Sequence, residues 1–482
     1  MSKKFSKEPL RGLTDFYPSD LREYNWIVEN IRNIADLYSY DEFRSPQLEP
    51  VEIFAAKSSD ELVNEQSFIV EKKEGERLIL IPELTPSLAR MVARRSQEFK
   101  KPIRWFSNPT CFRYERPQRG RRRQFNQINF DILGENSLYA ELEIFNIIID
   151  IFIEFGATAA QFQIYYNSRR FIDAVCNLIL KIPKDSFPSV YKVLDKSDKM
   201  EKPEFEKLVN DTFQDELIIK EIFKLAKAKN IEGLIDSFNN IPEEFFTSKG
   251  YIELVNFQSL LTAMGISDYC SFSSSIVRGL DYYTGIVFEV FDTGKENIRS
   301  IFAGGRYDNL LSLFSEEKIS GIGFGMGIFM LSLFLKTYNL IPEEATKKDY
   351  TDTIYITSIN EEVATYATEL AQIVRGEDLS CIVDYKFKNI KSQLKRASEL
   401  GVTITLIVGT EEMAENKVTI RNMISEIQKK VDMEDLIEEV GTEEMAENKV
   451  TIRNMISEIQ KKVDMEDLIE EIYKIIDDIS DP

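Results

Sequence analysis

Arginine is concentrated in one short stretch of this chain. Residues 112–127 read FRYERPQRGRRRQFNQ, and six of the eleven residues from Arg113 to Arg123 are arginines. The planar guanidinium group donates paired hydrogen bonds to phosphate or carboxylate oxygens. Because the whole chain carries a formal net charge of −21, this positive charge is a local feature, and it predicts a binding site for a polyanion.

The residues that follow the arginines alternate between polar and apolar side chains. In a strand, alternate side chains share a face, so Gln127, Asn129 and Asp131 face one side and the apolar residues between them face the core. Arg113 and Glu115 share a face of the preceding strand, and hairpin pairing is expected to set them beside Gln127 and Asp131. Burying such a cluster costs free energy unless it binds something polar. The alternative is a solvated sheet face that carries salt bridges.

Two further segments combine glycine with arginine and tyrosine. SSSIVRGLDYYTGIVFEVFD (273–292) places Arg278 and Gly279 before a tyrosine pair and a strand, although it also reads as a turn with aromatic core residues. AGGRYDNL (303–310) has a glycine pair that lets a ligand approach the backbone. GIGFGMG (321–327) does not match GxGxxG and follows no βαβ start, so we interpret it as a glycine-lined strand beneath a flat ligand.

The composition limits the chemistry that is available. The 482 residues include no histidine, which excludes serine, cysteine and zinc sites that depend on that side chain. The four cysteines are widely spaced without a CxxC pair, so we expect neither a disulfide nor a zinc site, and we expect a reducing, cytoplasmic location. No secretory signal is visible. The apolar run 144–155 is too short to span a membrane and predicts a buried helix.

The candidate residues need elements that position them. Strand and turn signals surround the arginines, whereas residues 169–262 show a helical pattern rich in lysine and glutamate. From about residue 350, strand and helix patterns alternate, which is typical of a small, mostly parallel α/β domain. We therefore predict a first domain built from 1–168 and 263–340, a helical insertion at 169–262, and an α/β domain at 350–482.

The C-terminal part contains a perfect duplication. GTEEMAENKVTIRNMISEIQKKVDMEDLIEE occurs at 409–439 and again, letter for letter, at 441–471. Solenoid repeats diverge and usually number three or more, so one perfect copy favours a recent duplication or an artefact of the sequence. A small α/β domain has one place for this element, and we expect one copy to be redundant, as an extra acidic helix.

Several motifs resemble those of one enzyme family. RYERPQRGRRRQFNQINFDILG resembles motif 2 of class II aminoacyl-tRNA synthetases, and VRGLDYYTGIVFE and AGGRYDNLL resemble the two signature motifs of histidyl-tRNA synthetases. RGLTDFYPSD and PELTPSLAR resemble N-terminal segments of that family, and residues 350–425 resemble its anticodon-binding domain. The resemblance implies an α+β fold: a class II catalytic domain, with an antiparallel sheet flanked by helices, a helical insertion and a C-terminal α/β anticodon-binding domain.

The resemblance also implies an activity. Histidine would react with ATP, in the presence of Mg²⁺, to give histidyl-adenylate, and the histidyl group would then be transferred to the 3′ end of histidine tRNA. The enzyme would be a homodimer in the cytoplasm. No protein-bound metal site is implied. The implied contacts to histidine are Glu83, Thr85, Gln127, Asp131, Arg278, Tyr282, Tyr283 and Tyr307. The implied contacts to ATP are Arg113, Glu115 and Arg121, and the implied catalytic residues are Arg113 and Arg278. The implied contacts to tRNA are Gln118, Arg119, Lys388 and Lys391. The two lysines alternatively belong to a solvated helix face.

Some positions depart from the family pattern. Phe329 and Met330 stand where a Glu-Arg pair usually follows the glycines of motif 3, Ile81 replaces an arginine, and Asn126 replaces a histidine. The missing motif 3 cation predicts ATP binding weaker by about 1–3 kcal/mol, unless Arg306 or an extra Mg²⁺ replaces it. An alternative is therefore a catalytically silent paralogue that acts as a histidine-sensing regulatory subunit or a tRNA-binding protein. The regulatory family lacks the anticodon-binding domain.

Overall fold

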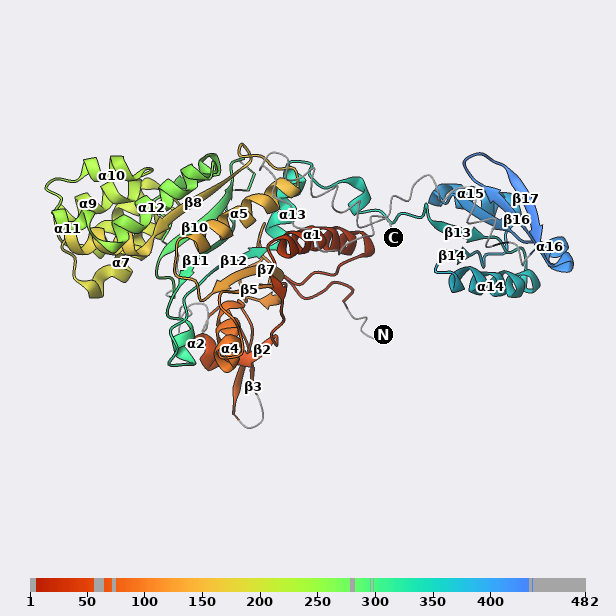
Figure 1. The fold of residues 1–482 in the computed structure, drawn as a ribbon, viewed down its shortest axis with the longest axis horizontal. Helices are drawn as coiled ribbons and strands as arrows, with labels where there is room; N and C mark the ends of the chain where they lie inside the picture. The colour runs from red at the N-terminus through yellow and green to blue at the C-terminus, as the bar shows by residue number, and fades with distance from the viewer. Residues whose placement is uncertain are drawn as a thin grey trace, which may run out of the picture. The chain divides into compact units, whose positions relative to one another are not determined.

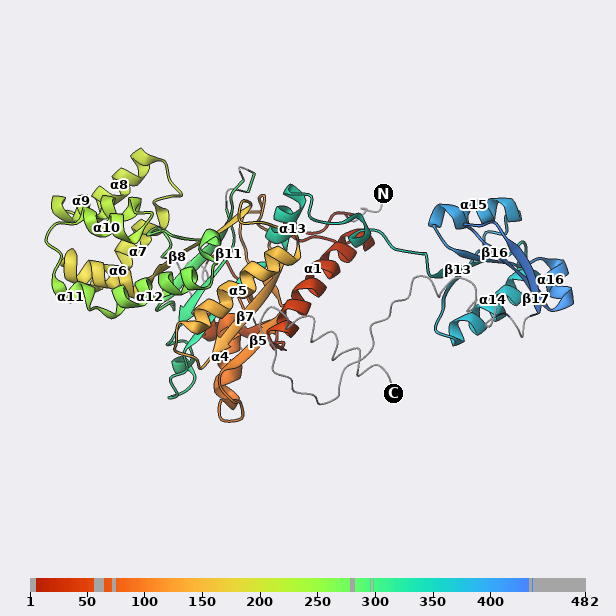
Figure 2. The same ribbon diagram turned by 45° about the horizontal axis from the view of Figure 1, so that its top comes forward.

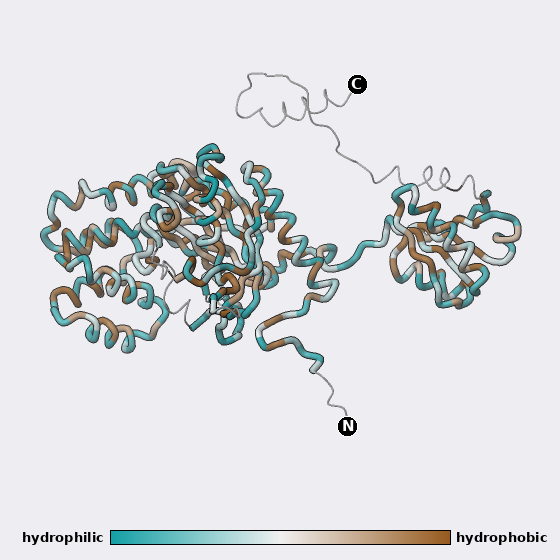
Figure 3. Tube along the Cα trace, turned by 90° about the horizontal axis from the view of Figure 1, so that it is seen from below, coloured by the Kyte–Doolittle hydropathy of each residue, from teal (hydrophilic) through white to brown (hydrophobic). Residues whose placement is uncertain are grey.

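The chain divides into two compact units, Met1–Lys347 and Lys348–Pro482, and each is described by itself. The computed structural model describes residues 6–55, 65–71, 75–277, 282–294, 296, 297, 299–432 and 436. Figure 1 shows the helices and strands of both units. In each unit, apolar residues are concentrated along the inner elements and hydrophilic residues along the outside (Figure 3).

A large, mostly antiparallel sheet forms the centre of the first unit (Figure 1). Its nine strands, counted over the described residues, run in the order β1-β5-β7-β12-β11-β10-β8-β9, with β6 paired beside β7. The edge pairs β1–β5 and β8–β9 are parallel, and the other pairs are antiparallel. The bounds are β1 (Asp41–Glu42), β5 (Ile103–Ser107), β6 (Thr110–Phe112), β7 (Gln124–Leu133), β8 (Phe162–Ser168), β9 (Cys270–Phe272), β10 (Ile286–Asp292), β11 (Ser300–Tyr307) and β12 (Gly321–Gly327).

Three helices cover one face of this sheet (Figure 2). They are α1 (Pro18–Leu37), α5 (Tyr139–Glu154) and α13 (Ile328–Thr337). The alternation of β7 explains this layer, because Ile128, Phe130 and Ile132 are buried in the same apolar cluster as the inner residues of the helices. The buried helix that the sequence predicts at 144–155 is confirmed as α5. No helix of the described part of the chain has the length and apolarity needed to cross a membrane.

The opposite face of the sheet carries smaller elements. Helix α4 (Thr85–Arg95) packs there in an apolar cluster with Ile103, Leu133 and Tyr307. Beside it lies a three-stranded sheet with the order β2-β4-β3, formed by β2 (Leu48–Pro50), β3 (Phe68–Glu71) and β4 (Arg77–Leu80), with helix α2 (Val51–Ala55). These elements leave much of the central strands on this face uncovered by helices.

The segment between β8 and β9 is helical, as its sequence pattern predicts. Its helices are α6 (Arg169–Ala174), α7 (Phe187–Lys196), α8 (Lys202–Thr212), α9 (Glu216–Lys227), α10 (Ile231–Ser237), α11 (Glu243–Phe246) and α12 (Lys249–Ala263). Asp215, Asn230 and Ser248 cap α9, α10 and α12, since each side chain accepts hydrogen bonds from the first backbone amides of its helix. Helix α12 contacts β8 and α5, which joins this segment to the core of the sheet.

The second unit is a smaller α/β structure. Its sheet has the order β14-β13-β15-β16-β17, in which β13 is parallel to β14 and β15, while β16 and β17 add an antiparallel hairpin. The elements are β13 (Thr353–Ile356), α14 (Glu361–Gly376), β14 (Ser380–Val383), α15 (Ile390–Leu400), β15 (Ile404–Ile407), α16 (Thr410–Glu415), β16 (Lys417–Asn422) and β17 (Gln428–Asp432). The first copy of the duplicated segment supplies the last three elements. The second copy, 441–471, lies outside the described residues.

Candidate active site

A cavity of about 970 Å³ opens on the face of the central sheet that is opposite α5, and the first residues of α13 reach its lining. The sequence-predicted residues that line it are Glu83, Thr85, Arg113, Glu115, Arg121, Gln127, Asp131, Tyr282, Tyr283 and Tyr307. Gln118 and Arg119 are exposed and do not line it. Lys388 and Lys391 belong to the second unit, and Arg278 lies outside the described residues.

Glycines of β12 form the floor of the cavity. Gly323 pairs with Asp131 and Gly325 with Asn129 in the register of β12 against β7. A Cβ atom at Gly323 would overlap the carboxylate of Asp131, and one at Gly325 would overlap the amide of Gln127. The glycines therefore leave room for polar side chains to lie flat across the neighbouring strand. This arrangement matches the glycine-lined strand that the sequence predicts beneath a flat ligand.

A buried carboxylate lies on this floor. Asp131 is 1% exposed, and its Oδ1 atom accepts a hydrogen bond of 2.5 Å from the hydroxyl of Tyr307. Its Oδ2 atom has no hydrogen-bond partner among the described residues. Burial raises the pKa of Asp131 to about 7, although the bond from Tyr307 acts in the opposite direction. A buried carboxylate oxygen without a partner is an acceptor for an N–H group of a ligand.

Tyrosines and a second acid form the wall beside Asp131. The hydroxyl of Tyr282 donates to Oε2 of Glu83 across 2.9 Å, and both side chains are buried. Burial and the charge of Glu83 raise the pKa of Tyr282 well above its usual value, so this hydroxyl stays protonated. The ring centroid of Tyr282 lies 4.8 Å from that of Tyr283 and 6.0 Å from that of Tyr307. Two carboxylates enclosed by aromatic rings suit a small cationic or N–H-donating ligand.

The pairing of Arg113 differs from the prediction. The strand is interrupted at Asn108 and Pro109, so β7 pairs with two short strands, β5 and β6. Trp105 of β5 lies opposite Asp131. Strand β6 ends at Phe112, and the backbone amide of Arg113 donates to the carbonyl of Arg123. The prediction that hairpin pairing sets Arg113 and Glu115 beside Gln127 and Asp131 is therefore wrong.

The side chain of Arg113 nevertheless lines the cavity. Its Nε atom donates to the carbonyl of Pro82 across 2.9 Å, and its guanidinium carbon lies 5.4 Å from the ring centroid of Phe125. The carbonyl of Pro82 directly precedes Glu83, so this bond ties the arginine to the acidic wall of the cavity.

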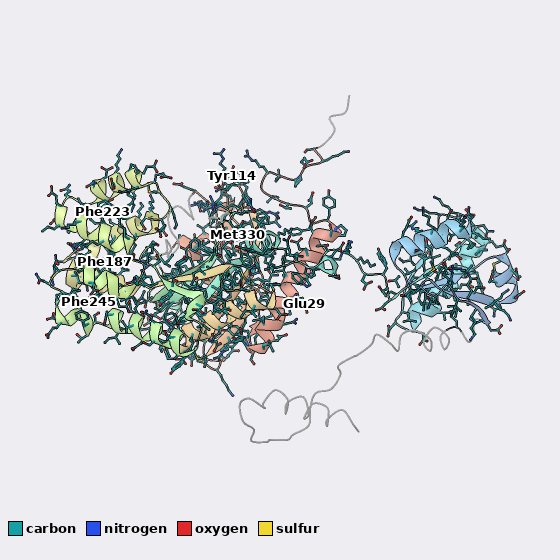
Figure 4. The ribbon with its side chains drawn as sticks, turned by 90° about the horizontal axis from the view of Figure 1, so that it is seen from above. Glu29, Tyr114, Phe187, Phe223, Phe245 and Met330 are labelled. Carbon is teal, nitrogen blue, oxygen red and sulfur yellow. The ribbon has the colours of Figure 1, made fainter. Side chains whose placement is uncertain are left out.

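The arginine-rich turn is tight. Gln118 and Arg121 exchange backbone hydrogen bonds of 3.3 and 2.9 Å around Arg119 and Gly120. Gly120 has a φ of +80°, which favours glycine, and a Cβ atom there would overlap the sulfur of Met330. Figure 4 labels Met330, which comes from α13, together with Tyr114 of the arginine-rich segment. The turn is therefore packed directly against the start of α13.

The arginines of this segment have different surroundings. Arg113, Arg121 and Arg122 line the cavity. Arg123 instead stacks on Tyr114 at 4.1 Å and donates to the carbonyls of Arg11 and Glu115. Arg123 belongs to the stretch predicted to bind a polyanion, but it does not line the cavity, and its side chain holds the N-terminal segment against the turn.

Comparisons with known proteins assign the chain to a family. Residues 12–331 match the family model of histidyl-tRNA synthetase, and residues 353–440 match the anticodon binding domain. A Histidine--tRNA ligase of Leptospira biflexa is 34% identical over 442 residues, which cover 91% of this chain and 98% of that relative. The chain belongs to the histidyl-tRNA synthetase family.

Solved structures have the same fold. The histidyl-tRNA synthetase of Nostoc sp. PCC 7120 superimposes with a TM-score of 0.68 at 22% identity, over 91% of this chain and 99% of that one. An ATP phosphoribosyltransferase regulatory subunit/histidyl-tRNA synthetase from Bacillus halodurans C gives a TM-score of 0.67 at 21% identity, over 85% and 100%. The predicted α+β fold of a class II synthetase is therefore confirmed.

The departures from the histidyl-tRNA synthetase pattern have structural explanations. Ile81 is fully buried in an apolar cluster beneath β4, where an arginine would lose its hydration. Asn126 points away from the cavity and donates to the hydroxyl of Thr110 across 3.1 Å. At motif 3, the guanidinium carbon of Arg122 lies 3.6 Å from the ring centroid of Phe329, which makes a cation–π contact. Phe329 therefore supports the arginine-rich turn from below.

Arg306 does not replace the missing motif 3 cation. Its guanidinium group is 3% exposed and forms an ion pair with Glu141. It also donates to the carbonyls of Glu135 and Ser137. The suggestion that Arg306 serves the nucleotide is wrong, because its hydrogen-bonding capacity is used within the fold.

The sequence did not identify several residues of the cavity. Phe125, Glu289 and Arg299 line it. Phe125 could have been found by strand alternation, because it shares a face with Gln127 and Asp131, and Glu289 as the acid inside the apolar run 286–291. Arg299 lies outside every motif, and nothing in its local sequence indicates a role. The described residues contain no group of three or more cysteines or acids that could hold a metal ion.

Proposed function

We propose that this protein is a histidine–tRNA ligase. It activates histidine with ATP to histidyl-adenylate and transfers the histidyl group to the 3′ end of histidine tRNA. The observation that carries the proposal is one cavity that holds both an oxygen of Asp131 without a partner among the described residues and the side chains of Arg113 and Arg121. The cavity thus combines a site for an N–H donor with a site for phosphate, in a member of the histidyl-tRNA synthetase family.

The acidic and aromatic wall binds histidine. Gln127, Asp131, Tyr282 and Tyr283 read the imidazole ring, whose N–H group is a donor that Asp131 accepts. The ammonium group lies near Tyr307 and contacts Glu83, which precedes α4, and Thr85, the first residue of that helix. Arg278 binds the carboxylate of histidine and the α-phosphate of ATP.

The arginine side of the cavity binds the nucleotide. Arg113 contacts the α-phosphate, Glu115 the adenine and Arg121 the outer phosphates. Glu115 and Arg121 form an ion pair of 2.8 Å, so a nucleotide that contacts both folds its outer phosphates back toward its base.

The reaction does not require a histidine side chain. The carboxylate of the substrate is an anion at neutral pH and attacks the α-phosphate without a general base. The protein has to bring two anions together and stabilise the charge of the transition state, and Arg113 and Arg278 do this. Mg²⁺ bound with ATP would add positive charge that stabilises the phosphates in the transition state.

The tRNA contacts two separate regions. Gln118 and Arg119 are exposed at the tip of the turn, where they meet the acceptor end. Lys388 and Lys391 are exposed beside and within the first turn of α15, where they meet the anticodon region. We propose catalytic segments at 1–168 and 263–340, a helical insertion at 169–262 and an anticodon-binding domain at 350–482. We also propose a homodimer that works in the cytoplasm, which the free thiols of all four cysteines support.

Histidine-dependent exchange of pyrophosphate into ATP tests the proposal. The expected result is exchange that requires histidine, is abolished by Arg113→Gln, and is accompanied by charging of histidine tRNA. Histidine binding without exchange would contradict the proposal and favour a histidine-sensing subunit. The match of residues 353–440 to an anticodon-binding domain argues against that second function, because the regulatory family lacks this domain.

A further inference from the structure

One arginine of the cavity has no role in the assignment above. Arg299 directly precedes β11, far in sequence from the arginine-rich turn, and it lines the cavity. Its Nη1 atom is buried and has no hydrogen-bond partner among the described residues. A buried guanidinium nitrogen without an acceptor is unfavourable in the empty protein, and a bound anion removes this cost.

The surroundings of Arg299 indicate which part of a ligand it meets. Burial and the positive charge of Arg121 lower the pKa of Arg299, and the nearby charge of Glu115 only partly opposes them. Arg299 therefore lies beside the ion pair of Arg121 and Glu115. An arginine–glutamate ion pair with a second arginine beside it leaves a net positive charge, which a phosphate group neutralises.

Arg113 and Arg121 are assigned to the nucleotide above, and the other cations in or near the cavity are engaged within the protein. Arg122 stacks on Phe329 at 3.6 Å. Lys199 pairs with Asp195 across 2.8 Å, and Lys229 pairs with Asp198 across 3.1 Å. Met330 provides no charge at the position where the family carries its motif 3 arginine, and Arg306 is neutralised by Glu141. Apart from Arg113 and Arg121, Arg299 is, among the described residues that line the cavity, the cation with a buried donor that has no partner.

We propose that Arg299 binds the outer phosphates of ATP together with Arg121, and that it supplies from the start of β11 the positive charge that Met330 lacks. This inference rests on the proposed function, because it names a nucleotide contact of the same site. It predicts selectivity for the triphosphate, since Arg299 is assigned to the β- and γ-phosphates and not to the base, the ribose or the α-phosphate.

Calorimetric titration with ATP and with AMP tests this assignment. Arg299→Met keeps the length of the side chain and removes its charge, so ATP binding is expected to weaken about 10- to 100-fold, the scale of one charged hydrogen bond. AMP binding is expected to stay within about twofold, because AMP lacks the outer phosphates. Arg299→Lys restores part of the ATP affinity. Arg95→Met, which removes an exposed arginine at the end of α4, controls for the loss of one positive charge.

The outcomes separate the proposals. Unchanged ATP affinity in Arg299→Met would overturn the inference, and so would an equal loss of ATP and AMP affinity, which would indicate a general role in the fold. A second substitution, Met330→Arg, added to Arg299→Met, is expected to recover part of the ATP affinity. If the parent protein shows no histidine-dependent exchange, the proposed function fails, while the ATP and AMP titrations still decide the role of Arg299.

Discussion

The hydroxyl of Tyr307 donates to one oxygen of Asp131 across 2.5 Å, while the other oxygen of that carboxylate has no partner among the described residues. Burial and the charge of Asp131 raise the pKa of the Tyr307 hydroxyl well above its usual value, so the hydroxyl stays a donor. Tyr307 therefore fixes the orientation of the Asp131 carboxylate. The second oxygen is held ready for a ligand, and its missing partner is a cost to the fold.

This cost predicts a trade-off between stability and binding in Asp131→Asn. An ordinary aspartate carboxyl group has a pKa of 3.8, and burial raises the pKa of Asp131 to about 7 in the folded protein. A raised pKa means that the folded state binds more protons between these values. The parent should therefore lose stability as the pH rises from about 4 to 7, by at most ~4 kcal/mol, and the full penalty remains above pH 7.

Urea unfolding at several pH values between 5 and 8 measures this effect. The stability of Asp131→Asn relative to the parent is expected to increase with pH up to about 7 and then level off. In the same variant, histidine affinity is expected to fall about 10- to 100-fold, because an amide is a weaker acceptor than a carboxylate. A stability difference that does not change with pH would show that Asp131 is not protonated in the empty protein.

Gly323→Ala tests the floor of the cavity. Its new Cβ atom overlaps both the carboxylate of Asp131 and the carbonyl of Phe130. We expect a loss of about 1–3 kcal/mol in the free energy of unfolding, from overpacking, and weaker histidine binding. Gly327→Ala adds the same methyl group to the same strand, where no atom of the described residues lies within 4 Å. Chemical unfolding of the two variants compares them directly, and an equal loss in both would contradict the close packing at Gly323.

The sequence predicted features that depend on neighbouring residues. The alternation of β7 placed Ile128 in the core and Asp131 in the cavity, and the glycine spacing of β12 predicted the floor. The family motifs identified many of the residues that line the cavity, because each motif carries its site residues within a few positions. The break at Pro109 was missed, because strand periodicity continues through the residues on both sides of it.

The remaining errors concern contacts between distant segments. Arg123 lies in the same run of arginines as the residues assigned to phosphate. Its side chain instead contacts Tyr114 and the backbone of the N-terminal segment at Arg11. Arg299 has no motif, and only the fold brings the start of β11 beside Arg121. Such placements depend on the tertiary arrangement of several strands, and no periodicity in one segment encodes them.

Phe329→Leu tests the support of the arginine-rich turn. The cation–π contact between Arg122 and Phe329 is worth about 0.5–2 kcal/mol. Without the ring, Arg122 loses its position and the turn that carries Arg121 becomes less ordered. We expect the KM for ATP in pyrophosphate exchange to rise about 2- to 30-fold, with little change in the KM for histidine. Phe329→Tyr keeps the face of the ring and should behave like the parent; a similar rise in both variants would contradict the cation–π explanation.

The duplicated segment allows the same substitution to be made in two places. Val418 lies in the first copy, on β16, and is fully buried in the apolar cluster of the second unit. Val418→Asp places a charge in that core without a partner and is expected to destabilise the unit by several kcal/mol, about 3 or more. Val450→Asp makes the identical change in the second copy, which the sequence predicts to be redundant because β16 and β17 already occupy the edge of the sheet.

Thermal unfolding of the two valine variants, together with a single-copy chain that lacks residues 440–471, decides the question. If the second copy is redundant, Val450→Asp and the single-copy chain should unfold at the temperature of the parent, whereas Val418→Asp should unfold earlier. Equal damage from the two aspartates would mean that both copies are packed in the folded protein. Damage from Val450→Asp alone would mean that the second copy, not the first, occupies the hairpin of β16 and β17, since the two segments have identical sequences and compete for one place.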